Sequence, residues 1–238
     1  MAKPARPTRS TKRRRSPRAP TPEHVVADST WTEGDLTLLS SDGVRFRVPS
    51  APLLACSPAL SAALTSDTLA LTDPALECAA VLRPFLAFAL KLDTAQVREA
   101  HRRTYLPASS ASPFVAVARL MAKWGCALEL RRLSYVFERE GRGYPGAGRD
   151  AFVVSALAGD TAACCRAIEG AAPDYTRAGG EAFVDRCALV PANVPPAVRE
   201  IVPPAYWAAL VKGWERSGKH RNRREWAYHF ELLVQGAK

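Results

Sequence analysis

The sequence contains none of the short patterns that mark a metal centre or a hydrolase. Its four histidines do not accompany a plausible nucleophile, and its six cysteines form neither a CxxC pair nor a Cys/His ligand spacing. The glycines lack the GxGxxG and GxxxxGKS/T arrangements that bind phosphate groups, and Ser57 lacks the GxSxG elbow of a serine hydrolase. We therefore predict a protein that is not an enzyme and has no metal and no cofactor.

Long apolar runs are also missing. No run reaches the ~20 residues that a membrane-spanning helix requires. The residues before the cysteines contain no apolar run typical of a secretory h-region, and several cysteines fall on apolar helix faces, so we expect buried, reduced thiols. With 47% apolar residues in 238 positions, the chain is long enough to bury a core. We predict a folded protein without a membrane span, located in the nucleus or the cytoplasm.

Acidic residues are scarce at the N-terminus. Residues 1–23 hold eight Lys or Arg and only Glu23, which gives a net charge of +7 out of the +10 of the whole chain. Five prolines and a shortage of large apolar residues prevent this segment from forming a packed element, and we predict a disordered basic tail over residues 1–29. Its cluster is typical of a nuclear import signal or a polyanion contact, although a short basic run can also be a solvated tail. The cluster consists of Lys12, Arg13, Arg14 and Arg15.

A second basic segment lies near the C-terminus. Residues 212–224 hold six Lys or Arg against Glu215, and Trp226, Tyr228 and Phe230 follow. Surfaces that bind nucleic acid use this mixture of rings and positive charge. Core packing of the rings beside a solvated basic edge accounts for the same pattern, and we favour it. Any nucleic-acid contact is then expected to be non-specific and made by the basic segments.

The strongest local structure signal lies in residues 35–64. Apolar and polar residues alternate over residues 36–38 and 44–48, on either side of Asp42-Gly43, which predicts a β-hairpin. Pro49 blocks further strand pairing because it has no N–H. Ser57 followed by Pro58 is typical of a helix N-cap and first helical position. We expect a hairpin followed by two short helices.

This arrangement resembles the opening of the BTB/POZ domain, a protein-protein interaction module. The resemblance rests on Asp35-Leu36-Thr37-Leu38, Asp42-Gly43, Phe46-Arg47-Val48, and Leu53, Leu54, Ala55, Ser57 and Pro58. Three further elements follow in the family's order: a short strand at Leu69–Leu71, a helix from Asp73-Pro74 that Pro84 kinks or divides, and a helix pair around Trp124-Gly125-Cys126. The chain differs from the family at Pro49-Ser50, where members commonly carry His and then a basic residue that forms a charged pocket with the residue at Asp35.

The resemblance implies an α+β fold with a small three-stranded sheet flanked by helices over residues 30–140. A Gly-rich linker at 141–149 and an all-helical C-terminal extension at 150–238 complete the expected organisation. The implied function is non-catalytic: a self-associating scaffold or adaptor, expected to form a homodimer. Leu53 and Leu54 are its candidate self-association residues, and Asp35 is its candidate pocket acid.

Two alternatives remain open at this point. Family members often act as substrate adaptors for cullin-type ubiquitin ligases. The family's cullin-contacting pattern is an apolar residue, any residue and then Glu, whereas Leu64-Thr65-Ser66 ends in Ser. The second alternative is a nuclear, transcription-related factor whose basic tails contact nucleic acid. No zinc finger or kelch repeat in the sequence favours either alternative.

Overall fold

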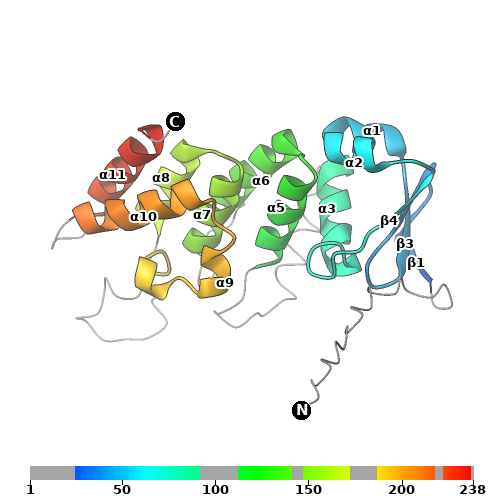
Figure 1. Ribbon diagram of the computed structural model, residues 1–238, viewed down its shortest axis with the longest axis horizontal. Coiled ribbons are helices and arrows are strands. Elements are labelled where there is room, and N and C mark those ends of the chain that lie inside the picture. Colours follow the sequence, from blue (N-terminus) through cyan, green and yellow to red (C-terminus); the bar gives the residue numbers. More distant parts are fainter. Residues whose placement is uncertain (1–24, 92–111, 141–146, 172–186, 218–221, 237–238) are drawn as a thin grey trace, which may run out of the picture.

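The computed structural model describes residues 25–91, 112–140, 147–171, 187–217 and 222–236, and within these ranges the chain has an α+β fold (Figure 1). The strands are β1 (Val26–Thr32), β2 (Leu36–Leu39), β3 (Val44–Val48) and β4 (Thr68–Ala70). The helices are α1 (Ser50–Cys56), α2 (Pro58–Ala63), α3 (Ala79–Lys91), α5 (Pro113–Lys123), α6 (Ala127–Glu140), α7 (Ala147–Leu157), α8 (Thr161–Gly170), α9 (Pro196–Arg199), α10 (Pro204–Arg216) and α11 (Arg223–Gln235), with a 3-10 turn η2 (Pro191–Asn193).

The predicted hairpin is confirmed. Strands β2 and β3 pair antiparallel, with Leu36 opposite Val48 and Leu38 opposite Phe46. These four side chains are buried, while Arg45 and Arg47 lie on the exposed face. The predicted strand near Leu69 is also present, since β4 pairs parallel with β2.

The prediction of a three-stranded sheet is wrong, because the described residues form a four-stranded sheet in the order β1-β3-β2-β4. Strand β1 pairs parallel with β3 and starts at Val26, inside the range that we assigned to the basic tail. Its pairing is irregular between Ala27 and Thr32, and its buried residues are Asp28 and Trp31. Because these two residues are three positions apart, β1 lacks the two-residue alternation that identifies a strand in a sequence.

Helix α3 differs from its prediction at its start, and of the two outcomes predicted at Pro84 it does not show the division. The helix begins at Ala79 and continues through Pro84 to Lys91 without dividing. The expected start at Asp73 is a separate turn, in which the Asp73 carboxylate accepts hydrogen bonds from the amides of Ala75 and Leu76. A proline inside a helix removes one backbone donor, but tertiary packing keeps α3 continuous around it.

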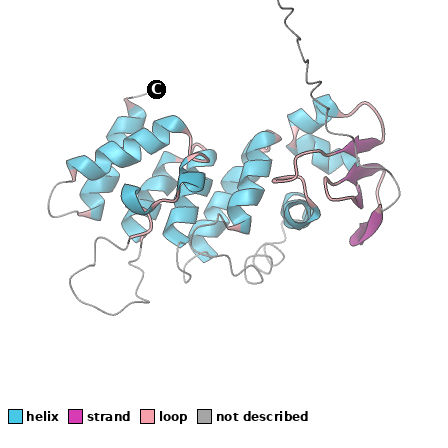
Figure 2. Cartoon of the chain, turned by 60° about the horizontal axis from the view of Figure 1, so that its bottom comes forward, coloured by secondary structure: helices cyan, strands magenta, loops and turns pink. Residues whose placement is uncertain are grey.

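The helices extend away from the sheet as a row of neighbouring pairs, and both views place the sheet and the C-terminus at opposite ends (Figures 1 and 2). Helix α3 packs on α5, α5 and α6 pack on α7, α7 packs on α8, and α8 packs on α11, which pairs with α10. One hydrophobic core runs through all of them, from Trp31 to Val234. No helix in the described ranges is long and apolar enough to cross a membrane.

The predicted Gly-rich linker at 141–149 is partly helical. Residues 141–146 lie outside the described residues, but α7 already begins at Ala147. A Cβ atom added at Gly148 would lie 3.1 Å from the Cα atom of Ala171, directly after α8. Gly148 therefore permits close packing of α7 against the end of α8. Helix α7 packs directly on α5 and α6, and α8 packs on α6.

Candidate functional site

Ser57 connects helices α1 and α2 to the turn between α5 and α6. Its Oγ accepts a hydrogen bond from the amide of Leu60 at 3.1 Å, with Pro58 in the first helical position, so the predicted N-cap is confirmed. The same hydroxyl donates a hydrogen bond to the carbonyl of Trp124 at 2.6 Å. Ser57 therefore fixes the junction of α1 and α2 to the turn between α5 and α6.

The two helices have an apolar inner face and an uncharged outer face. Leu53 and Leu60 point into the core and are 0% and 3% exposed. The outer face consists of small side chains, which we call the uncharged surface. Its exposed residues are Ala51, Pro52, Ala55, Pro58, Ala59, Ser61, Ala62 and Ala63.

This surface differs from the other helical surfaces of the chain. Among the described residues, exposed Arg side chains lie on six other helices, namely Arg83 on α3, Arg131 on α6, Arg166 on α8, Arg199 on α9, Arg216 on α10 and Arg224 on α11. By contrast, the 19 residues from 48 to 66 include no Asp, Glu, Lys, Arg or His. This run is visible in the sequence, and it is the signal by which the surface could have been predicted. Charge is depleted at the centre of protein-protein interfaces, and the uncharged surface shares this one feature with a binding face, whereas its many Ala side chains are not typical of interfaces.

Asp35 binds the start of α1. Its carboxylate accepts hydrogen bonds from the amide of Ser50 at 2.7 Å and from the Ser50 hydroxyl, and Pro49 provides no side-chain cap of its own. The hydroxyl and amide of Ser50 hold the pKa of Asp35 below its ordinary value. Asp35, the residue before β2, thus acts as a carboxylate that caps the start of α1.

The structure places the other candidate residues as follows. Leu53 is enclosed in the core of its own chain, where a partner cannot contact it, and Leu54 is half-buried beside it. The exposed residues around Leu54 are therefore the better candidates for self-association. The cluster Lys12 to Arg15 lies outside the described residues, so nuclear import stays a prediction.

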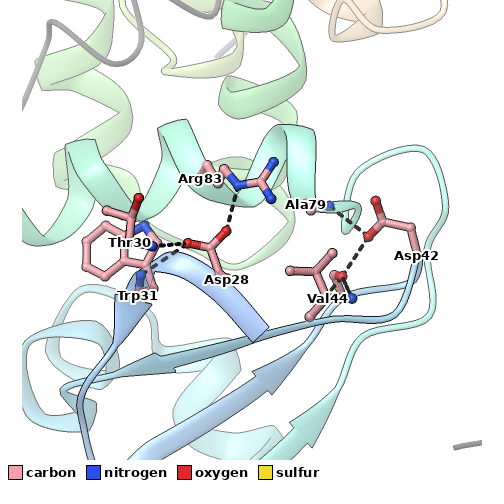
Figure 3. Close-up of polar contacts among 8 residues, drawn as sticks. Asp28, Thr30, Trp31, Asp42, Val44, Ala79 and Arg83 are labelled. Carbon is pink, nitrogen blue, oxygen red and sulfur yellow. Dashed lines mark hydrogen bonds and ion pairs between the residues drawn. The ribbon is translucent and has the colours of Figure 1, made fainter. Parts of the chain in front are cut away.

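An ion pair joins β1 to α3 (Figure 3). The Asp28 side chain is 0% exposed and accepts a hydrogen bond from Arg83 Nε at 2.6 Å. It also accepts hydrogen bonds from the amides of Thr30 and Trp31 at 2.8 and 3.1 Å. Burial alone raises the pKa of Asp28, but these hydrogen bonds outweigh burial and hold the pKa below its ordinary value.

A second carboxylate fixes the start of α3 (Figure 3). Asp42, in the hairpin turn, accepts a hydrogen bond from the amide of Ala79 at 2.9 Å and from the Ser40 hydroxyl at 2.6 Å. Burial raises the pKa of Asp42, and these two donors lower it further than burial raises it. Asp42 therefore caps α3 from a distance of 37 residues in the chain. The Asp42-Gly43 signal predicted the turn but gave no indication of this second role.

The Glu77 carboxylate has more polar contacts than those of Asp28, Asp35 and Asp42, and no sequence pattern predicted its role. One oxygen accepts hydrogen bonds from the amides of Thr72 and Asp73, both at 2.9 Å. The other oxygen accepts from Trp124 Nε1 at 3.2 Å and lies 2.8 Å from Lys123 Nζ. Burial raises its pKa, but the hydrogen bond from Lys123 and the other donors produce a net lowering. Glu77 thus joins the end of the sheet to the α5–α6 turn.

Acid is expected to destabilise the chain through these three carboxylates. The pKa values of Asp28, Asp42 and Glu77 are lower in the folded chain than their ordinary values of 3.8, 3.8 and 4.5. Their contribution is fully present above the unfolded pKa values and is lost as the pH falls through the folded ones. Urea unfolding followed by circular dichroism should give a midpoint that falls below about pH 4.5. An Asp28→Asn variant should be less stable at neutral pH and should lose less stability on acidification, and an acid dependence equal to that of the parent chain would contradict this assignment.

The aromatic residues of the second basic segment pack mainly in the core. Trp226 and Phe230 are buried, and Trp226 Nε1 donates a hydrogen bond to the carbonyl of Leu210 at 3.0 Å. Only Tyr228 of the three is exposed. The favoured interpretation of these rings as core residues is therefore confirmed for two of the three, and α11 presents no continuous aromatic platform.

No group of three or more His, Cys, Asp or Glu residues in the described ranges is placed to bind a metal ion. Comparison of the chain with protein-family models, with curated proteins and with solved structures gave no match. The function is therefore inferred from the chain's own surface and contacts.

Proposed function

We propose that this protein is a non-catalytic, BTB/POZ-like interaction module that self-associates through the uncharged surface of α1 and α2 and acts as a scaffold or adaptor. The order of the elements supports this proposal. An antiparallel hairpin, two short helices, a strand parallel to β2, a long helix and a helix pair follow one another, as the resemblance implies. The proposed location is nuclear or cytoplasmic.

The single observation that carries the proposal is the absence of charge from an exposed helical surface in a chain that is otherwise rich in charge. Charged residues make up 24% of the sequence, yet residues 48–66 contain none. Contact with a second copy would remove the exposed methyl and proline groups from water without removing a charge from water. Small side chains also allow the helices of two copies to approach closely. A homodimer is the simplest partner that satisfies these conditions.

Charged substitutions on this surface are expected to weaken self-association without unfolding the chain. Ala55 lies in the last turn of α1 and Ala59 in the first turn of α2, and both are exposed. The helix dipole favours a cation at the first of these positions and an anion at the second, so Ala55→Arg and Ala59→Glu should preserve the fold. In a symmetric dimer each charge enters the interface twice, and we expect the dissociation constant to rise at least about tenfold.

Sedimentation velocity of the parent chain and each variant over a concentration series measures this effect, with circular dichroism to verify folding. Ala208→Arg, on the exposed face of α10, is the matched control and should sediment as the parent chain does. A parent chain that stays monomeric at tens of micromolar would exclude self-association and leave a monomeric adaptor. Purification of a cullin with this monomer would select the ubiquitin-ligase alternative.

A further inference from the structure

Two cysteines from distant parts of the chain meet beneath α1. Cys56 is the last residue of α1, and Cys126 lies in the turn between α5 and α6. Their Sγ atoms are 4.0 Å apart although 70 residues separate them in the chain. A disulfide bond requires about 2.0 Å between the sulfur atoms. The two thiols are therefore one small side-chain movement away from bonding distance.

The backbone on both sides of the thiol pair is held in place. Ser57, next to Cys56, donates its hydrogen bond to the carbonyl of Trp124, two residues before Cys126. The amide of Cys126 donates to the carbonyl of Met121 at 2.9 Å, which fixes the turn itself. Because both segments are tied to each other, the thiols stay close whenever the chain is folded. Such enforced proximity raises the effective concentration of one thiol at the other.

The two thiols differ in access and in acidity, and the difference indicates Cys56 as the thiol that reacts first. Cys56 is half-buried, so a small reagent can reach it, whereas Cys126 is 0% exposed. The hydrogen bond from Cys126 lowers the pKa of the Cys56 thiol, against the opposing effects of burial and the Glu129 carboxylate. The hydrogen bond with Cys56, together with burial, raises the pKa of Cys126 well above its ordinary range. The more exposed thiol is therefore also the more acidic one.

We propose that Cys56 and Cys126 form a disulfide in response to hydrogen peroxide, with Cys56 as the attacking thiol and Cys126 as the resolving thiol. The Cys56 thiolate attacks one peroxide oxygen, the O–O bond breaks, and the released hydroxide takes a proton to become water. The sulfur of Cys126 then attacks the Cys56 sulfenic acid, its proton leaves with the hydroxyl group as a second water, and the S–S bond forms. Two thiols lose two electrons and peroxide gains them.

Mass spectrometry of the full chain tests this proposal directly. The folded protein is treated with hydrogen peroxide, remaining thiols are alkylated, and the chain is cleaved before its aspartates. This cleavage places Cys56 in residues 42–66, Cys78 in residues 73–92 and Cys126 in residues 93–149. We expect the first and third fragments to be joined, with a mass two hydrogens below their sum. The cross-link should also raise the melting temperature by about 5–10 °C.

Substitutions assign the two roles. In Cys126→Ser, Cys56 should stop at the sulfenic acid and be trapped by dimedone, whereas Cys56→Ser should give neither product. Cys78→Ser, which changes a half-buried cysteine elsewhere, should form the cross-link as the parent chain does. The proposal would be overturned if Cys56 and Cys126 remained free thiols, and were therefore both alkylated, after prolonged treatment of the parent chain with excess peroxide. Joining of a different pair of fragments would overturn it as well, and neither result depends on a variant that folds.

Discussion

Replacement of Leu53 by aspartate is expected to unfold the protein. The Leu53 side chain is 0% exposed and belongs to the core beneath α1. Removing a buried leucine side chain costs about 2–5 kcal/mol, and burying a carboxylate without a partner adds to this cost. Domains of this size have a free energy of unfolding of about 5–15 kcal/mol. The substitution is therefore expected to remove most or all of this free energy. Circular dichroism should show loss of the cooperative thermal transition.

The matched control introduces the same residue on the opposite face of the same helix. Ala51 is exposed in the first turn of α1, where the helix dipole favours an anion, so Ala51→Asp should keep a cooperative thermal transition. Because Ala51 belongs to the uncharged surface, this variant should also weaken the proposed self-association. A folded, monomeric Leu53→Asp protein would instead show that Leu53 faces a partner. That outcome would contradict the placement of Leu53 in the core.

The elements that the sequence predicted correctly are those specified by neighbouring residues. Asp42-Gly43 requires a tight turn, and the alternation on both sides selects the buried face of each strand. Ser57-Pro58 supplies an N-cap and a preset first helical position. Gly125 has a φ of 71°, which favours glycine and ends α5, so the predicted helix pair is also confirmed. In each case the physical cause lies within a few residues of the effect.

Strand β1 could not be predicted in the same way. It pairs parallel with β3, which is not its neighbour in the chain, and no turn residue marks that pairing. One of its two buried residues is the carboxylate Asp28, which a sequence pattern assigns to the surface. Asp28 is buried because Arg83, 55 residues later, supplies a compensating charge. The strand therefore depends on a tertiary contact that no local pattern contains.

The surface that we propose for self-association lies on the two helices that the resemblance indicated, but it consists of other residues than Leu53 and Leu54. The resemblance directed attention to α1 and α2, and it nominated Leu53 and Leu54 because apolar residues were expected at an interface. The structure shows that Leu53 is needed by the core of its own chain, so small exposed residues such as Ala55 and Ala59 form the outer face. Periodicity identifies a buried face, but it does not distinguish burial within the chain from burial against a partner.

The second large effect is expected from Glu77→Ala, which should lower the melting temperature by about 6–12 °C. The substitution leaves the amides of Thr72 and Asp73 and the indole N–H of Trp124 without their acceptor. Each buried donor without a partner costs about 1–3 kcal/mol. Thr72 is exposed, so water can replace the acceptor of its amide, and the total cost is roughly 3 kcal/mol. The ion pair with the partly exposed Lys123 contributes little to this sum.

Two variants separate the hydrogen bonds of Glu77 from its charge. Glu77→Gln keeps one carbonyl acceptor but turns an NH2 group toward a donor, so thermal unfolding should give an intermediate melting temperature. Lys123→Ala removes the partly exposed cation that pairs with both Glu77 and Asp73, and it should lower the melting temperature by no more than about 2–4 °C. If Lys123→Ala proved as destabilising as Glu77→Ala, the charge pair rather than the buried donors would hold the sheet to the α5–α6 turn.

Because Trp124 also accepts the hydrogen bond from Ser57 through its carbonyl, the same turn supports the helices that carry the uncharged surface. Loss of Glu77 should therefore also weaken the self-association that we propose, even though Glu77 itself lies outside that surface.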